Sequence, residues 1–187
     1  MTNQPPSPQG RTDTQLGVTM KPRDLIVVAI LLALGTVLYA FMPNISGVTP
    51  DMVYVFTTLA LLLVRPKIGF ALAIGIVAGV LSMVFSKSSV PVVNVVTHPI
   101  GVVLATLVIT YTPDRRGYEI WKPIAAAMVY GIASGGLAIT FFWRLANLPT
   151  SEYLLGMWPT VLITSAIAAF INVILYGMAR RVSLAPA

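Results

Sequence analysis

The stretch Ile68–Ser86 reads IGFALAIGIVAGVLSMVFS, and none of its residues carries a charge. A hydrocarbon core about 30 Å thick is crossed by roughly 20 apolar residues in an α-helix. Outer-membrane barrels instead use strands of about 10 residues in which apolar and polar side chains alternate. Because the stretch shows no such alternation, it predicts a transmembrane helix.

Five further apolar runs of similar length lie along the chain. They are Leu25–Met42, Ile45–Val64 (interrupted by Asp51), Ser88–Pro113 (interrupted by His98), Pro123–Trp143 and Tyr153–Ala179. Of the 187 residues, 57% are hydrophobic and 10% are charged, against about 25% charged in soluble domains. The sequence therefore predicts an all-α integral membrane protein with six transmembrane helices, forming a single membrane domain over residues 25–181.

The two ends of the chain have a different composition. Residues 1–24 combine several prolines with Ser, Thr and Gln, and such a segment cannot bury enough apolar surface to fold. We expect residues 1–24 to form a disordered cytoplasmic tail and residues 182–187 to form a short cytoplasmic tail. The chain has no cysteine, which excludes disulfides and thiolate metal sites.

The basic residues predict the orientation. If the N-terminus is inside, ten of the 12 lysines and arginines lie on the inner side, and Lys87 and Arg144 lie on the outer side. Positive residues concentrate on the cytoplasmic side of membrane proteins, so both termini are expected in the cytoplasm (N-in/C-in). We expect a multi-pass protein of the cell (cytoplasmic) membrane. Its net charge of +6 comes from basic residues that we expect to contact anionic lipid headgroups and not to bind nucleic acid.

Polar side chains gather toward the predicted outer ends of the helices. They are Asp51, Asn94, Thr97, His98, Arg144 and Glu152. An ionisable group at membrane depth is costly unless it faces protein, water or a ligand. We therefore expect an outward-facing substrate pocket. The plainer alternative is that Asn94 makes an interhelical hydrogen bond and that His98 is a packed neutral side chain.

Asp51 precedes an apolar run, Met52–Val64, that covers only about 20 Å as a helix. Either residues 44–50 enter the membrane as irregular backbone, or the helix is longer and Asp51 is buried. Both options predict a pocket, because irregular backbone at that depth must be covered by protein or line a cavity. Thr49-Pro50-Asp51 is also an ordinary signal for a helix N-terminus, and the two interpretations can coexist.

Asn94 and His98 are four residues apart, so they lie on one face of a helix. One histidine without cysteine or a nearby acid supplies too few ligands for a metal, and we expect neither metal nor cofactor. The sequence contains no GxxxxGK[ST], HExxH or GxSxG motif, and it has no paired intramembrane acids. We therefore predict that the protein is not an enzyme.

Small residues four apart predict close helix packing at three places. The pairs are Ala29 with Ala33, Gly75 with Gly79, and Gly131 with Gly135. The first pair could equally serve contact with another subunit.

Several of these segments together resemble the tryptophan transporter TrpP family, over about residues 20–181. They are AILLALGTVL (29–38), GVTPDM (47–52), RPK (65–67), IGIVAGVLSMVF (74–85), VPVVNVVTHP (90–99) and FINVILYGMARR (170–181). That family is grouped with the substrate-binding S components of energy-coupling-factor transporters. The resemblance implies an S-component-like bundle that captures substrate outside and works with a transmembrane coupling subunit and a pair of ATPases.

The resemblance also implies that Ala29 and Ala33 contact the coupling subunit. The chain departs from the family at Thr97 and His98, where the family often has an acid and a lysine before the proline that matches Pro99. Thr97 and His98 are thus nearly neutral where the family often has two opposite charges. This difference could change which ligand is bound, or the charge that the ligand carries.

The leading interpretation is a subunit that imports a small aromatic amino acid, and the resemblance implies tryptophan. We expect Arg144 or the N-terminal end of the helix within Ser88–Pro113 to bind the carboxylate, and Asp51 or Glu152 to bind the ammonium. Asn94 or His98 would contact the indole N–H. Tyr54, Trp143 or Trp158 would pack on the ring. The alternatives are another aromatic or vitamin-like ligand, and a membrane scaffold that transports nothing.

Overall fold

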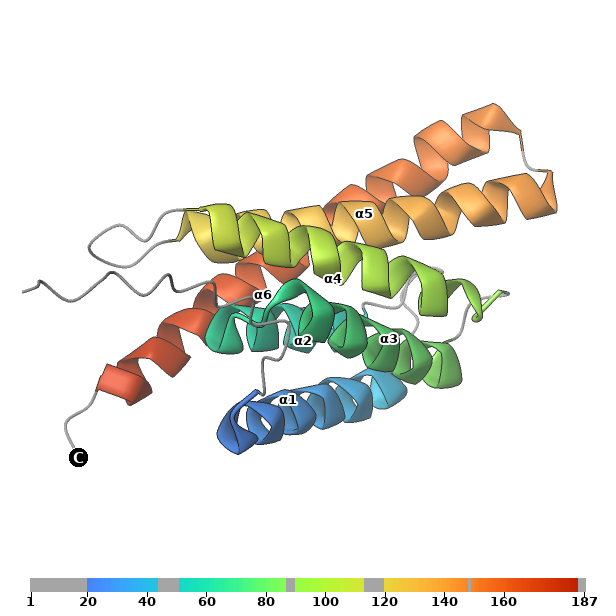
Figure 1. Ribbon diagram of the computed structural model, residues 1–187. Helices are drawn as coiled ribbons and strands as arrows, with labels where there is room; N and C mark the ends of the chain where they lie inside the picture. The colour runs from blue at the N-terminus through green and yellow to red at the C-terminus, as the bar shows by residue number, and fades with distance from the viewer. Residues whose placement is uncertain (1–19, 44–50, 87–89, 113–119, 148, 185–187) are drawn as a thin grey trace, which may run out of the picture.

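The computed structural model describes residues 20–43, 51–86, 90–112, 120–147 and 149–184. These residues form six α-helices and one π-helical segment, η1, and within these ranges no residue is in a strand. The elements are α1 (Pro22–Phe41), α2 (Met52–Val64), α3 (Ile68–Phe85), α4 (Val93–Tyr111), α5 (Trp121–Ala146), η1 (Glu152–Met157) and α6 (Trp158–Leu184) (Figure 1). The predicted all-α class is confirmed.

Five of these segments are long and apolar enough to cross a membrane. They are α1, α3, α4, α5 and the continuous segment Glu152–Arg181 formed by η1 and α6. α2 has 13 residues and is too short to cross alone. The chain is thus a multi-pass helical membrane protein, and six complete spans with both termini inside remain a prediction.

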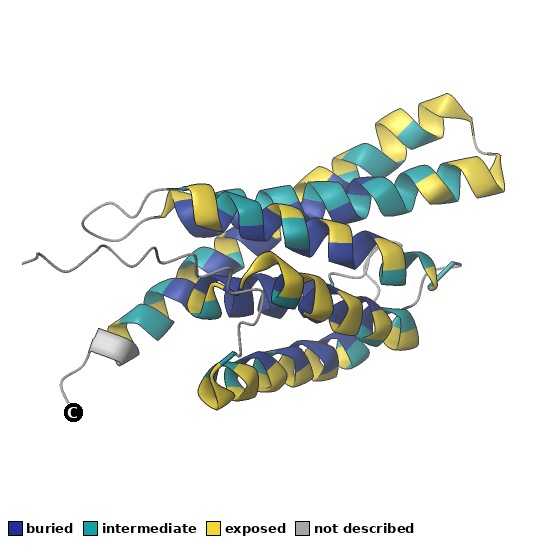
Figure 2. Ribbon diagram, viewed as in Figure 1, coloured by how far each residue is buried: buried dark blue, intermediate teal, exposed yellow. Residues whose placement is uncertain are grey.

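The short helix α2 lies at the centre of the bundle. It contacts α1, α3, α4, α5 and α6, and every residue from Met52 to Leu62 is buried (Figure 2). A helix that is apolar all round is stable only where protein or lipid surrounds it. Because neighbouring helices surround α2, its length need not match the thickness of the bilayer.

The remaining helices pack largely in chain order around α2. α1 lies on α2, α3 on α4, α4 on α5, and α5 on α6. In Figure 1, α1 lies at one side of the bundle and α4 and α5 at the opposite side, while the turn that joins α5 to α6 extends beyond the other helices.

Close packing of α3 on α4 depends on the two predicted glycines. A Cβ on Gly75 would lie 2.6 Å from the Cα of Pro99, and a Cβ on Gly79 would lie 2.6 Å from the carbonyl oxygen of Asn94. No side chain fits at such distances, so α4 approaches α3 backbone to backbone. The contact fixes the position of the α4 turn that contains Asn94, His98 and Pro99.

Several helix boundaries differ from the expected ones. α1 begins at Pro22, so the last residues of the expected 1–24 tail are helical, and α6 continues past Arg181 to Leu184. Proline suits the first turn of a helix, which explains the early start of α1. Lys122, assigned from sequence to an inner connector, lies in the first turn of α5 and is 1% exposed. Residues 1–19, residues 44–50 and Lys87, on which other expectations rested, lie outside the described residues.

A candidate substrate cavity between α2, α4, α5 and α6

Asp51 is the N-cap residue of α2. Its Oδ1 accepts a hydrogen bond of 3.1 Å from the backbone N–H of Tyr54, which is the usual arrangement for an aspartate at this position. The sequence signal for a helix N-terminus is therefore confirmed. The cap holds the carboxylate at the end of the buried central helix, with its side chain 25% exposed.

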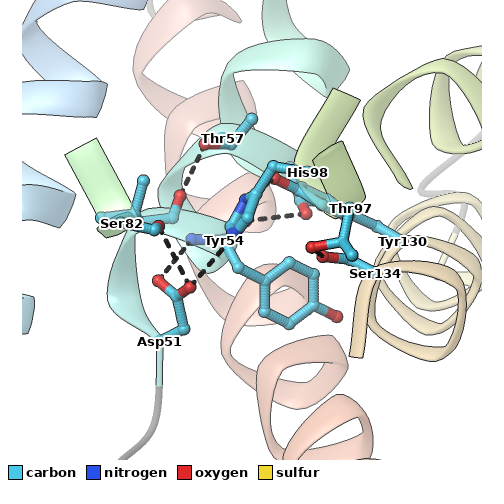
Figure 3. Close-up of polar contacts among 10 residues, drawn as sticks. Asp51, Tyr54, Thr57, Ser82, Thr97, His98, Tyr130 and Ser134 are labelled. Atoms are coloured by element: carbon cyan, nitrogen blue, oxygen red, sulfur yellow. Dashed lines mark hydrogen bonds and ion pairs between the residues drawn. The ribbon is translucent and has the colours of Figure 1, made fainter. Parts of the chain in front are cut away.

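The second oxygen of Asp51 contacts two other helices. Asp51 Oδ2 accepts a hydrogen bond of 3.2 Å from Ser82 Oγ of α3 and lies 3.3 Å from His98 Nε2 of α4 (Figure 3). A hydroxyl and an imidazole N–H are both suitable donors to a carboxylate. Asp51 thus joins the beginning of α2 to α3 and α4.

His98 is 3% exposed and also contacts α5. Its Nδ1 lies 2.7 Å from the hydroxyl oxygen of Tyr130. A carboxylate can only accept, so Nε2 carries a proton, and with the ring assigned as neutral Nδ1 accepts a hydrogen bond from the Tyr130 hydroxyl. Both ring nitrogens of His98 thus contact protein groups.

Two tyrosines, Tyr54 and Tyr130, pack against each other and connect the Asp51–His98 pair to α5. Tyr130 is fully buried, and its ring meets the rings of Tyr54 and His98 edge to face, with centroids 4.7 Å and 5.7 Å away respectively. The hydroxyl of Tyr54 donates to the carbonyl of Ala127 on α5. Buried tyrosines need such partners for their hydroxyls, and here the bonds join α2 and α4 to α5.

A cavity of about 190 Å³ opens beside Asp51 and His98. For comparison, an apolar cavity of about 150 Å³ holds benzene. Its lining comprises Asp51, Met52, Tyr54, Val55, Asn94, His98, Gly131, Ser134, Gly135, Ala138, Thr160, Val161, Thr164, Ser165, Ile167, Ala168 and Ile171. The wall is thus largely apolar, with hydroxyls, one amide, one imidazole and one carboxylate. Such a site suits a small ring compound with a few polar groups.

The structure brings four of the predicted site residues together at this cavity: Asp51, Tyr54, Asn94 and His98. Asn94 and His98 both line it, as their spacing on one helical face predicted. Thr97 does not line the cavity. It is fully buried beside it, and its hydroxyl accepts a hydrogen bond of 3.4 Å from Ser134.

Trp143, Arg144, Glu152 and Trp158 do not line the cavity. They lie where α5 ends and the η1–α6 segment begins, with Arg144 and Glu152 exposed. The ring of Trp143 stacks on Tyr153 at 4.7 Å, and the Arg144 guanidinium lies 4.4 Å from the centroid of the Trp143 ring. Trp158 packs against Gly136 and meets Tyr153 edge to face. Trp143, Tyr153 and Trp158, with Arg144 over Trp143, thus form a separate aromatic cluster.

Ala29 and Ala33 both lie on the exposed side of α1. The buried side of the same helix consists of Val28, Leu32, Gly35, Thr36 and Tyr39. The two alanines therefore do not take part in packing within the bundle, and contact with a partner subunit remains a prediction.

Sequence reasoning missed Ser82, Tyr130, Ser134 and Ser165. Ser82 follows Gly75 and Gly79 at helical spacing, so it shares their α4-facing side, a signal that was present in the sequence. Tyr130 occupies the middle of an apolar run, where a tyrosine needs a buried partner for its hydroxyl. Nothing in the sequence pairs it with His98. Among the described residues, no group of three or more His, Cys, Asp or Glu side chains that could hold a metal ion occurs.

Comparison with known proteins gives one informative similarity. The chain is 30% identical over 89 residues to a "Probable tryptophan transport protein" of Bacillus subtilis (strain 168). The alignment covers 46% of this chain. The aligned segment spans about half the length of that relative (50%). No family model matches the chain, and no solved structure matches it.

Proposed function

We propose that this protein is a membrane transport subunit that binds a small aromatic amino acid, tryptophan first of all, in the cavity beside Asp51 and His98. The observation that carries the proposal is the cavity itself. It combines apolar walls of a size suited to a ring with a partly exposed carboxylate at one end. The similarity to a protein named for tryptophan transport supports the same ligand.

Within the site, Asp51 binds the ammonium group, and Tyr54 and the apolar residues of α6 pack against the ring. Both nitrogens of His98 are engaged by Asp51 and Tyr130, so His98 positions Asp51 and has no acceptor left for an indole N–H. Asn94 provides an amide oxygen at the cavity wall and is the better candidate for that contact.

The distribution of basic residues supports an orientation in which the end of α2 that carries Asp51 faces the outside. Substrate would then enter from the outer side. A separate coupling subunit with two ATPases would drive release inward, with Ala29 and Ala33 on the exposed side of α1 as the contact. This part of the proposal rests on the resemblance of the sequence motifs.

The test is direct binding of L-tryptophan to the purified full chain in nanodiscs, measured by calorimetry. We expect saturable binding to the wild type and weaker binding to Asp51→Ala and Asn94→Ala. Arg65→Ala, at the far end of α2, is the control. Wild-type affinity in both cavity variants would refute the site, and absence of binding to the wild type would refute the function.

A further inference from the structure

The hydrogen bonds of Asp51 leave one acceptor position of its carboxylate unused. A carboxylate offers roughly four acceptor positions on its two oxygens. Oδ2 is used by Ser82 and His98, whereas Oδ1 is used by the N–H of Tyr54 alone. Because Asp51 lines the cavity and is 25% exposed, Oδ1 can accept another donor from a ligand.

The charge of Asp51 is also uncompensated among the described residues around it. Its three donors are a backbone amide, a hydroxyl and the His98 imidazole, and with that ring assigned as neutral none of them is cationic. Within the part of the chain that the structure describes, no lysine or arginine lines the cavity. Arg144 is exposed beyond the end of the cavity, and Lys122 is buried in the first turn of α5.

An anionic group held in a mostly apolar wall favours a cationic ligand and disfavours an anionic one. An ammonium can form a charge-assisted hydrogen bond with Oδ1. A ligand carboxylate, in contrast, would meet no described cation in the cavity and would be repelled by Asp51.

From this geometry we infer that the cavity selects aromatic compounds bearing a cationic amine as a class, and that the carboxylate of an amino acid is dispensable for binding. The inference deepens the proposed function and rests on it. Tryptamine and tryptophan amide are then ligands in their own right, whereas indole-3-propionate, which keeps the ring and the carboxylate and lacks the amine, is not.

The experiment measures binding of L-tryptophan, tryptamine, tryptophan amide and indole-3-propionate to the full chain in nanodiscs by calorimetry. We expect the dissociation constants of tryptamine and the amide to lie within about tenfold of that of tryptophan, or below it. We expect indole-3-propionate to bind at least about a hundredfold more weakly, because loss of a partner for a partly buried charge costs that much or more.

Two charge variants identify the group responsible. Asp51→Asn keeps the N-cap, since asparagine caps helices as well as aspartate does, and removes the charge. We expect it to weaken tryptamine binding by about tenfold or more and to reduce the preference for amine over acid. Asp24→Asn removes one negative charge from the first turn of α1, outside the cavity, and should leave the affinity for tryptamine and the preference for amine over acid unchanged.

The outcomes separate this inference from the proposed function. Tryptophan binding with tryptamine and the amide each more than about a hundredfold weaker would overturn the inference, because the carboxylate would then be recognised. An amine preference left intact in Asp51→Asn would overturn it too. If none of the four compounds binds the wild type, the proposed function fails, and the inference fails with it.

Discussion

The hydroxyl of Tyr130 lies 2.7 Å from Nδ1 of His98, and the opposite nitrogen of the same ring lies 3.3 Å from Asp51 Oδ2. Tyr130 is fully buried and does not line the cavity, so it acts on a ligand through His98 and Asp51. Four helices thus determine the orientation of one carboxylate: α5 holds Tyr130, α4 holds His98, α3 holds Ser82, and α2 is capped by Asp51.

Tyr130→Phe tests this positioning role. The variant keeps the ring and leaves His98 Nδ1 buried without its donor, at a cost of about 1–3 kcal/mol. We expect tryptophan affinity to fall by about tenfold. Since His98 is the sole histidine of the chain, ¹⁵N labelling of histidine gives one set of ring signals. They should report the Nε2–H tautomer in the wild type and a mixture in the variant.

The control is Tyr111→Phe, at a tyrosine that is 81% exposed at the end of α4. It should change neither the affinity nor the ring signals of His98. An unchanged tautomer in Tyr130→Phe would show that Asp51 alone orients the histidine.

The helices and their apolar character could be predicted from the sequence because bilayer thickness imposes a length that hydropathy reveals directly. The short α2 was one of two options that the sequence left open, since Asp51 and Arg65 bound a run that is too short to span. The central position of α2 in the bundle could not be predicted, because a run that is apolar on all sides does not show which helices surround it.

Part of the site could also be predicted from the sequence. Asn94 and His98 share a face at helical spacing, and Asp51 precedes a helix, so local rules place all three. The contact of His98 with Tyr130 joins residues 32 positions apart and depends on how α4 packs on α5. For Trp143 and Arg144 the sequence could not distinguish two roles. An aromatic or charged side chain near the membrane surface is expected both in a ligand pocket and in an interfacial anchor.

Gly79→Ala should destabilise the packing of α3 on α4. The added Cβ would lie 2.6 Å from the carbonyl oxygen of Asn94. This oxygen belongs to the backbone, so no side-chain rotation can relieve the clash. Overpacking of this kind costs about 1–3 kcal/mol. We expect a lower midpoint of thermal unfolding in detergent and, because Asn94 moves with the backbone, weaker tryptophan binding.

Gly69→Ala is the matched control in the same helix, since no atom lies within 4 Å of a Cβ at that position. Alanine favours the helix by up to about 1 kcal/mol over glycine, so this variant should be as stable as the wild type or slightly more stable. Equal loss of stability in both variants would argue against a specific contact between α3 and α4 at Gly79.

Arg144→Ala should leave tryptophan affinity within about twofold of the wild type. The Arg144 side chain is exposed and lies over the Trp143 ring, outside the cavity, and an exposed cation–π contact contributes only about 0.5–1 kcal/mol to local stability. Calorimetry of this variant beside Asn94→Ala separates the two regions. A loss of about tenfold or more in Arg144→Ala would instead assign the ligand carboxylate to Arg144.

Ser165→Ala should stabilise the ligand-free protein. The Ser165 hydroxyl is buried, with its residue 1% exposed, and makes no well-formed hydrogen bond among the described residues, although the Tyr54 hydroxyl lies near it. Many other helical hydroxyls here, such as that of Thr164, donate to the carbonyl four residues earlier. Removal of an unsatisfied buried hydroxyl recovers about 1 kcal/mol or more, which corresponds to roughly 2–4 °C in Tm for a chain of this size.

Ser134→Ala is the comparison, because Ser134 also lines the cavity but donates to Thr97. Loss of that bond should lower Tm, so the two serine variants are expected to shift in opposite directions when thermal unfolding is followed in the same detergent without ligand. If Ser165→Ala lowers Tm as Ser134→Ala does, the Ser165 hydroxyl has a partner in the folded protein. The cavity wall at α6 is then more tightly bonded to α5 than the structure indicates.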